Sequence, residues 1–140
     1  MLYNDQSLDP AQFTILIIDD ELTNIEVLAS ILRSQGYTII SASNGPEGRQ
    51  KAINDQPDII LLDIMMPGED GFETCKRLKD NPVTSEIPVI FVSALDDVEN
   101  VVKGLDLGAW DYITKPFKKK EVLARVKNYL KLKYYYDRII

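Results

Sequence analysis

The chain has 140 residues, a length that suits one domain with a continuous hydrophobic core. Its formal net charge of −6 at pH 7 argues against a surface that binds nucleic acid, because phosphate binding needs clustered Lys and Arg. The absence of histidine excludes His-based catalysis and zinc binding through His, while the single cysteine, Cys75, excludes an internal disulfide and favours a reducing cytoplasm.

The start of the chain carries no targeting pattern. Residues 1–10 are polar and acidic, unlike the basic-then-apolar order of a signal peptide, and no apolar run approaches membrane-spanning length. We expect no membrane partner. We also expect residues 1–12 to be a flexible segment, residues 13–132 to form the domain, and residues 133–140 to be a helical extension or linker.

The first elements are a buried strand and an amphipathic helix. Residues 13–18 are almost entirely apolar and are followed by the adjacent acids Asp19 and Asp20. Residues 22–35 place apolar side chains on one helical face, and Gly36 ends the helix. The residues of this face are Leu22, Ile25, Leu28, Ile31 and Leu32.

The middle of the chain repeats the same order. Residues 37–42 are an expected strand and residues 46–54 an expected short helix. Residues 57–63 then contain four consecutive large apolar residues that lead directly into Asp63. Such a run is typical of a strand buried on both faces, which places Asp63 at its carboxyl end.

Two further strands also end on polar residues. After a helix over residues 72–79, residues 88–93 form a strand that ends on Ser93, and residues 110–114 form a strand followed by Lys115. Between them, Asp96 and Asp97 can cap a helix that ends near Gly108, with an apolar stripe of Val98, Val101, Val102 and Leu105. The last helix turns Val122, Leu123, Val126, Tyr129 and Leu130 inward.

Five strands alternating with five helices predict an α/β fold, with a parallel sheet between two layers of helices. Because crossovers between parallel strands are right-handed, few topologies remain. The flavodoxin-like, doubly wound (βα)5 arrangement with strand order 2-1-3-4-5 is the simplest fit.

In that sheet the carboxyl ends of four strands meet at one edge and bring together Asp19, Asp20, Asp63, Ser93 and Lys115. Three crowded carboxylates repel one another unless some are protonated or a hard cation lies among them, and oxygen ligands suit Mg²⁺ or Mn²⁺. A lysine and a hydroxyl suit the oxygens of a phosphoryl group, and a carboxylate can attack phosphorus.

Each of these residues also has an ordinary structural explanation. The acids after the first strand can cap the first helix, Ser93 can be a strand-end hydroxyl, and Lys115 can be a surface residue. Their shared position at the same end of the same kind of strand favours a site.

Four motifs, in this order, resemble the receiver domain of bacterial two-component response regulators, which also occurs in hybrid histidine kinases. They are Ile17-Ile18-Asp19-Asp20-Glu21, Asp63-Ile64-Met65-Met66-Pro67-Gly68-Glu69-Asp70-Gly71, Val92-Ser93-Ala94 and Tyr112-Ile113-Thr114-Lys115-Pro116-Phe117. The resemblance covers roughly residues 13–132.

The resemblance implies that Asp63 accepts a phosphoryl group from a histidine kinase or a histidine phosphotransfer protein. It implies that Asp20 is the main acidic Mg²⁺ ligand, that Asp19 holds the metal largely through water, and that Met65 contributes its backbone carbonyl. A receiver is a regulatory domain rather than an enzyme, although it assists its own phosphotransfer and autodephosphorylation.

The remaining implied roles belong to the switch. Lys115 pairs with the phosphoryl oxygens, across a cis bond to Pro116, and Ser93 closes on the phosphoryl group. The ring of Tyr112 follows and changes the surface of the fourth helix, fifth strand and fifth helix; the alternative is a core aromatic that never moves. Two positions that modulate dephosphorylation hold the apolar Met65 and Leu95, which predicts a long-lived phosphoryl group.

The output is left open by the sequence. Some receivers form dimers through charged pairs on the last two helices and strand. This sequence matches part of that pattern, with Asp106 and Lys127, and with Asp111 and Arg125. Glu121 is also present, but Val101 lies where its basic partner is expected. Solvated surface charges are the alternative. The last helix looks like a connector to a fused output domain outside this chain, or a docking helix of a stand-alone receiver.

Other functions remain as alternatives. A phosphorylation-independent interaction module would be expected to lack Asp63, Lys115 or the acid pair, and all are present. A Mg²⁺-dependent phosphohydrolase would need a general acid where Met65 lies. A flavin carrier of the same fold would need hydroxyls and glycines after the first strand, where this chain has acids.

Overall fold

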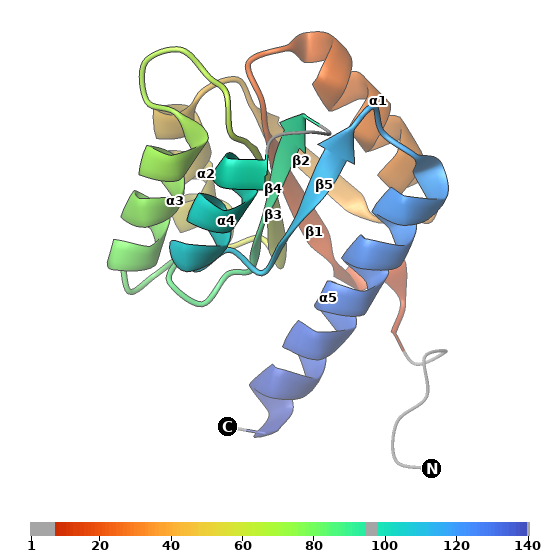
Figure 1. The fold of residues 1–140 in the computed structure, drawn as a ribbon. Helices are drawn as coiled ribbons and strands as arrows, with labels where there is room; N and C mark the ends of the chain where they lie inside the picture. Colours follow the sequence, from red (N-terminus) through yellow and green to blue (C-terminus); the bar gives the residue numbers. More distant parts are fainter. Residues whose placement is uncertain (1–7, 95–97, 140) are drawn as a thin grey trace.

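The computed structural model describes residues 8–94 and 98–139. Its centre is a sheet of five parallel strands in the order β2-β1-β3-β4-β5 (Figure 1). The strands are β1 (Thr14–Ile18), β2 (Thr38–Ala42), β3 (Ile59–Asp63), β4 (Val89–Ala94) and β5 (Asp111–Lys115). The flavodoxin-like, doubly wound (βα)5 fold predicted from the sequence is confirmed.

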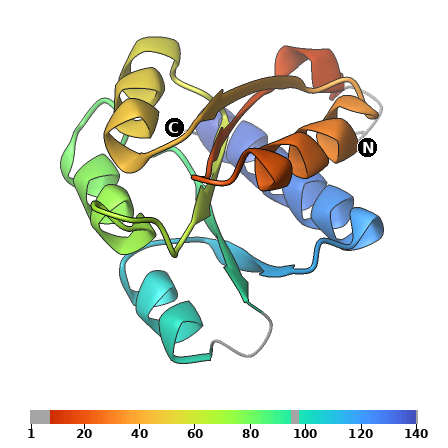
Figure 2. The ribbon, with the colours of Figure 1, turned by 90° about the horizontal axis from the view of Figure 1, so that it is seen from above.

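Helices cover both faces of the sheet. They are α1 (Leu22–Arg33), α2 (Gly45–Asp55), α3 (Gly71–Asp80), α4 (Val98–Asp106) and α5 (Lys119–Ile139). Seen from above, α1 and α5 lie on one face and α2, α3 and α4 on the other (Figure 2). Expected and observed element ends differ by no more than two residues.

The two helix layers explain the uninterrupted apolar runs of the strands. Every residue of β3 is buried, with Leu61 packing toward α1 and α5 and Leu62 toward α2 and α3. Successive side chains of a strand point to opposite faces, so a sheet covered on both sides needs apolar residues at every position. The core therefore lies in two layers, one on each side of the sheet.

The apolar face predicted for the first helix is wrong at one position. Ile25, Leu28 and Leu32 are buried and Ile31 packs against the core, but Leu22 is 67% exposed. Leu22 opens α1 beside the loop that follows β1, before the helix passes over the sheet. Its side chain therefore has no strand to cover it.

The apolar stripe predicted for the fourth helix is wrong at Val102 and Leu105. Val102 is 53% and Leu105 42% exposed, and Val101 is half-buried. The helix instead approaches the sheet closely at Gly104. A Cβ at this position would lie 2.5 Å from the ring of Phe91 in β4, so the contact leaves no room for a side chain. The predicted cap at Asp96 and Asp97 lies outside the described residues, as does the side chain of Val98.

The described part of the chain begins with a short helix and ends with a long one. Pro10–Gln12 forms a short 3-10 helix before β1, while residues 1–7 of the expected flexible segment lie outside the described residues. Helix α5 turns Val122, Val126 and Leu130 into the core and continues past the sheet to Ile139 (Figure 1). Among the described helices, none combines the length and apolar character needed to cross a membrane.

Candidate functional site

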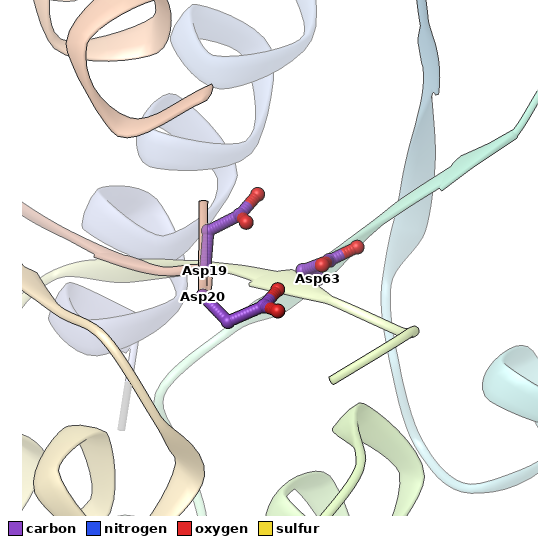
Figure 3. A group of neighbouring side chains, drawn as sticks. All are labelled: Asp19, Asp20 and Asp63. Atoms are coloured by element: carbon purple, nitrogen blue, oxygen red, sulfur yellow. The ribbon is translucent and has the colours of Figure 1, made fainter. Parts of the chain in front are cut away.

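Three carboxylates meet at the carboxyl edge of the sheet. Asp63 is the last residue of β3, and Asp19 and Asp20 follow the neighbouring strand β1. One carboxylate oxygen from each residue lies within 4.8 Å of the others, and the side chains of Asp20 and Asp63 point toward the same space (Figure 3). The structure thus brings together the acids that the sequence placed at strand ends.

Burial makes this cluster unfavourable for negative charge. Asp63 is almost fully buried, and desolvation, with repulsion from Asp19, raises its pKa to about 6, although Lys115 and the backbone N–H of Met65 oppose the shift. Desolvation also raises the pKa of Asp19. The N–H of Glu21, which donates to Asp19 Oδ1 at 2.9 Å, opposes this shift. Asp20 is exposed. Two of the three acids therefore lie where an ionised carboxylate needs a positive partner.

A cation fits the free oxygen of this cluster. Within the described residues, Asp19 Oδ2 is buried and has no hydrogen-bond partner. A buried carboxylate oxygen without a donor is costly, and a hard divalent ion beside three carboxylates would satisfy it. The donor set, which is oxygen throughout, suits Mg²⁺ or Mn²⁺ rather than a softer metal.

The lysine at the other side of the site reaches the central acid. Lys115, the last residue of β5, donates from Nζ to Asp63 Oδ1 at 3.2 Å. The Lys115–Pro116 peptide bond is cis. Only one strand, β4, lies between β3 and β5 in the sheet. The ends of β3 and β5 are therefore close enough for the long side chain of Lys115 to bridge them.

The two residues expected to switch lie on β4 and β5. Ser93 is buried, and its hydroxyl donates to the carbonyl of Ala94 at 3.2 Å. Tyr112 is half-buried, pairs in register with Phe91, and has the guanidinium carbon of Arg125 5.9 Å from its ring centroid. The hydroxyl and the ring thus lie on adjacent strands that lead to the site.

The loop after Asp63 returns to the strand it leaves. The N–H of Gly71 donates to the carbonyl of Ile64 at 2.9 Å, and a Cβ on Gly71 would lie 2.3 Å from the carbonyl oxygen of Asp63. Only glycine fits so close a contact. Within the loop, Met65 is 70% exposed at its side chain, while its backbone N–H lowers the pKa of Asp63. Leu95, the other apolar position singled out in the sequence, lies outside the described residues.

The charged residues expected at a dimer interface are partly paired within the chain. Arg125 forms an ion pair with Asp111, and the hydroxyl of Tyr129 donates to Asp111 Oδ2 at 2.7 Å. Arg125 Nε also lies 3.7 Å from Glu121 Oε1. Asp106 and Lys127 are exposed.

Sequence reasoning missed two groups near the site. Asn24 lies in the first turn of α1, lowers the pKa of Asp19 and donates from its amide to Glu21 Oε2 at 3.5 Å. Glu69, in the loop after Asp63, is held by Arg49 of α2. The sequence shows Glu69 only as an acid within a turn. Its partner could not be predicted, because that depends on which helix lies beside the loop.

Comparison with known proteins gives one consistent result. A family model described as "Response regulator receiver domain" matches residues 15–127. The chain is 42% identical over 125 residues to the response regulator PleD of Caulobacter vibrioides, covering 89% of this chain and 28% of PleD. It is 44% identical over 117 residues to the alkaline phosphatase synthesis transcriptional regulatory protein PhoP of Bacillus subtilis, covering 84% of this chain and 48% of PhoP.

A solved structure agrees with these relatives. The signal receiver domain of a signal transduction histidine kinase from Syntrophus aciditrophicus matches with a TM-score of 0.78 and 39% identity, covering 85% of this chain and 90% of that one. The chain spans less than half the length of the two curated relatives described above.

Proposed function

Because the chain belongs to the family of response regulator receiver domains, which are phospho-acceptor signalling domains, we propose that Asp63 is its phosphoryl acceptor. The observation that supports this assignment is the position of Asp63, which is buried at a strand end between the acids of β1 and the ammonium of Lys115. The donor is a phosphohistidine of a histidine kinase or a histidine phosphotransfer protein.

The residues of the site suit an in-line transfer. A carboxylate oxygen of Asp63 attacks the phosphorus of the phosphohistidine, and the P–N bond breaks as the O–P bond forms, with its electron pair leaving on the imidazole. At pH 7 Asp63 is mostly ionised, since its pKa is about 6. Lys115, 3.2 Å from Asp63 Oδ1, is placed to pair with the phosphoryl oxygens.

The acids of β1 are proposed as the cation site. Asp20 and Asp19, with Asp63 and the backbone carbonyl of Met65, would hold Mg²⁺ or Mn²⁺, which supplies positive charge that offsets the carboxylates and the phosphoryl oxygens. The unpartnered oxygen of Asp19 supports this assignment. Asp20, as the exposed member, is the acid that an entering ion reaches first.

The switch is proposed to run through Ser93 and Tyr112. A phosphoryl group on Asp63 offers acceptor oxygens that compete with the carbonyl of Ala94 for the Ser93 hydroxyl. Movement of Ser93 leaves room that the half-buried ring of Tyr112 can enter, which changes the α4, β5 and α5 surface. That surface passes the signal on to a fused output domain, a second copy of the chain, or a docking partner, in the cytoplasm.

The test is intact mass after incubation with Mg²⁺ and acetyl phosphate, a small phosphoryl donor that replaces the kinase. We expect one added phosphoryl group on the wild type and none on Asp63→Asn, which keeps the shape of the side chain but removes the nucleophile. The proposed role is regulatory, in which the domain assists its own phosphorylation and dephosphorylation.

Two outcomes would contradict the assignment. An adduct of equal yield on Asp63→Asn would place the acceptor elsewhere. Neither an adduct nor beryllofluoride binding by the wild type would favour the alternative of an interaction module that signals without phosphate.

A further inference from the structure

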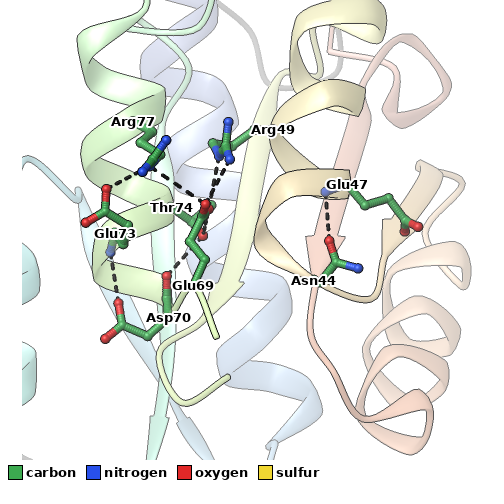
Figure 4. Close-up of polar contacts among 8 residues, drawn as sticks. All are labelled: Asn44, Glu47, Arg49, Glu69, Asp70, Glu73, Thr74 and Arg77. Carbon is green, nitrogen blue, oxygen red and sulfur yellow. Dashed lines mark hydrogen bonds and ion pairs between the residues drawn. The ribbon is translucent and has the colours of Figure 1, made fainter. Parts of the chain in front are cut away.

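A cluster of ionic contacts holds the loop that follows the phosphoryl acceptor. Glu69 lies in this loop, between β3 and α3, and receives hydrogen bonds from two helices (Figure 4). Arg49 of α2 donates from Nε to Oε2 at 3.0 Å and from Nη2 to Oε1 at 2.8 Å. The hydroxyl of Thr74 in α3 donates to Oε2 at 2.7 Å. We call this set of three residues the Glu69 clamp.

The clamp is enclosed rather than a surface ion pair. The Glu69 side chain is only 12% exposed, and the hydrogen bonds from Arg49 hold the pKa of its carboxyl below the usual value despite burial. Gly45, the first residue of α2, leaves the room it needs, because a Cβ there would lie 2.4 Å from Glu69 Oε2 and 2.3 Å from Thr74 Oγ1. A two-point Arg–carboxylate pair fixes orientation as well as distance.

The clamp and the acceptor site share one short loop. The loop is closed at its base by the hydrogen bond between Gly71 and Ile64, and Met66 packs into the core. Glu69 anchors the opposite side, beyond Gly68, whose φ of +74° makes the turn. Met65 lies between these anchors, and its exposed side chain contributes little packing to hold its own backbone in place.

We propose that Glu69 is a positioning residue: through Arg49 and Thr74 it fixes the loop that carries Met65, whose backbone carbonyl would be a ligand of the proposed cation site. The inference rests on the proposed function, since the cation site is part of it. Glu69 is not among the acids that would hold the cation. Its effect is on the affinity of the site, through the orientation of a ligand that belongs to the backbone.

The test is Mn²⁺ affinity, measured by electron paramagnetic resonance at a temperature where each variant is folded. Glu69→Gln and Arg49→Lys should weaken Mn²⁺ binding by roughly tenfold, the usual effect of losing a group that orients a metal ligand. The matched control is Glu73→Gln, which removes the same charge four residues further along the chain. Both Glu69 and Glu73 form an ion pair with Arg77, but Glu73 is not part of the clamp. The Mn²⁺ affinity of Glu73→Gln should stay that of the wild type.

A second readout separates positioning from general damage. The rate of phosphorylation by acetyl phosphate should fall in Glu69→Gln at low Mn²⁺ and recover at saturating Mn²⁺, because only the cation affinity has changed. If Glu69→Gln does not fold, Arg49→Lys provides the same comparison, since lysine keeps the charge and loses the two-point contact.

The outcomes are distinct. Equal Mn²⁺ affinities of Glu69→Gln and Glu73→Gln, with a lowered melting temperature for Glu69→Gln alone, would overturn the inference and leave the clamp a structural contact. Absence of Mn²⁺ binding by the wild type would instead overturn the proposed cation site, and the clamp's role in it.

Discussion

At the scale of single residues, the site is built from groups that the fold holds in an unfavourable state. Asp63 and Asp19 are buried, and burial raises the pKa of both carboxyls. Without a cation, ionised Asp63 is opposed by Asp19 and stabilised mainly by Lys115. This arrangement makes three ionised carboxylates unfavourable by themselves and would favour the proposed cation and phosphoryl group.

The pH dependence of stability should reveal that unfavourable charge. The pKa of Asp63 is raised from 3.8 to about 6, so the folded state binds the proton more tightly and the free energy of unfolding falls as pH rises through this window. Without divalent cations, Asp63→Asn should therefore stabilise the protein by about 1–3 kcal/mol at pH 7.5, and by little at pH 4. Urea unfolding at the two pH values measures the difference. A variant less stable than the wild type at pH 7.5 would contradict it.

The exposed side chain of Met65, beside the proposed acceptor, should set the lifetime of the phosphoryl group. Met65 cannot orient a water molecule for attack on phosphorus, because its thioether is a weak acceptor and no donor. We expect the wild-type phosphoprotein to decay slowly and Met65→Asn to decay several-fold faster. Loss of the added mass over time measures both rates. Decay of purified wild-type phosphoprotein within seconds would show that this prediction is wrong.

At the scale of the elements, α4 leaves part of its apolar stripe exposed. It packs on the sheet through Gly104 against Phe91, and its apolar Val102 and Leu105 are exposed. A helix with a glycine at its contact point has few side chains interlocked with the sheet. It also presents these apolar side chains outward.

The glycine contact can be tested by adding one methyl group. Gly104→Ala places a Cβ 2.5 Å from the Phe91 ring and should destabilise the protein by ~1–2 kcal/mol, even though alanine favours helix formation. Val102→Ala, on the exposed side of the same helix, should change stability by no more than about 0.5 kcal/mol. Thermal unfolding of the two variants provides the comparison. Equal effects would mean that α4 does not pack tightly at Gly104.

At the scale of the whole molecule, the acid cluster would couple the proposed metal binding to folding. Its three members come from two strand ends 44 residues apart in the sequence, Asp19 and Asp63, so the site exists only when β1 and β3 are paired. A ligand that binds only the folded state raises its stability. Cation binding should therefore be visible as a change in global stability.

Saturating Mg²⁺ should raise the melting temperature by roughly 5–10 °C, which corresponds to about 2–3 kcal/mol at a hundredfold excess over the dissociation constant. Asp20→Asn should lose most of this increase. Glu21→Gln, which removes the charge of the adjacent exposed acid, should keep it. Differential scanning calorimetry with and without Mg²⁺ measures the shift, and an equal loss in both variants would indicate nonspecific charge screening.

Local patterns in the sequence determined the alternation of elements, the two-layer core and the edge where the site lies. Apolar runs in strands reflect burial on both faces, and the handedness of crossovers leaves few strand orders, so Asp19, Asp20, Asp63 and Lys115 could be placed together from the sequence. Their chemistry followed from residue type, since crowded carboxylates beside a lysine suit a cation and a phosphoryl group.

Tertiary structure decided which apolar faces are buried and which distant charges are paired. Periodicity identifies the side chains that share a helix face, but not whether the sheet covers that face, and so Leu22, Val102 and Leu105 were predicted wrongly. The clamp between Glu69 and Arg49 likewise depends on α2 and the β3–α3 loop lying side by side. Interactions between segments distant in sequence depend on how elements pack, and no local pattern encodes that packing.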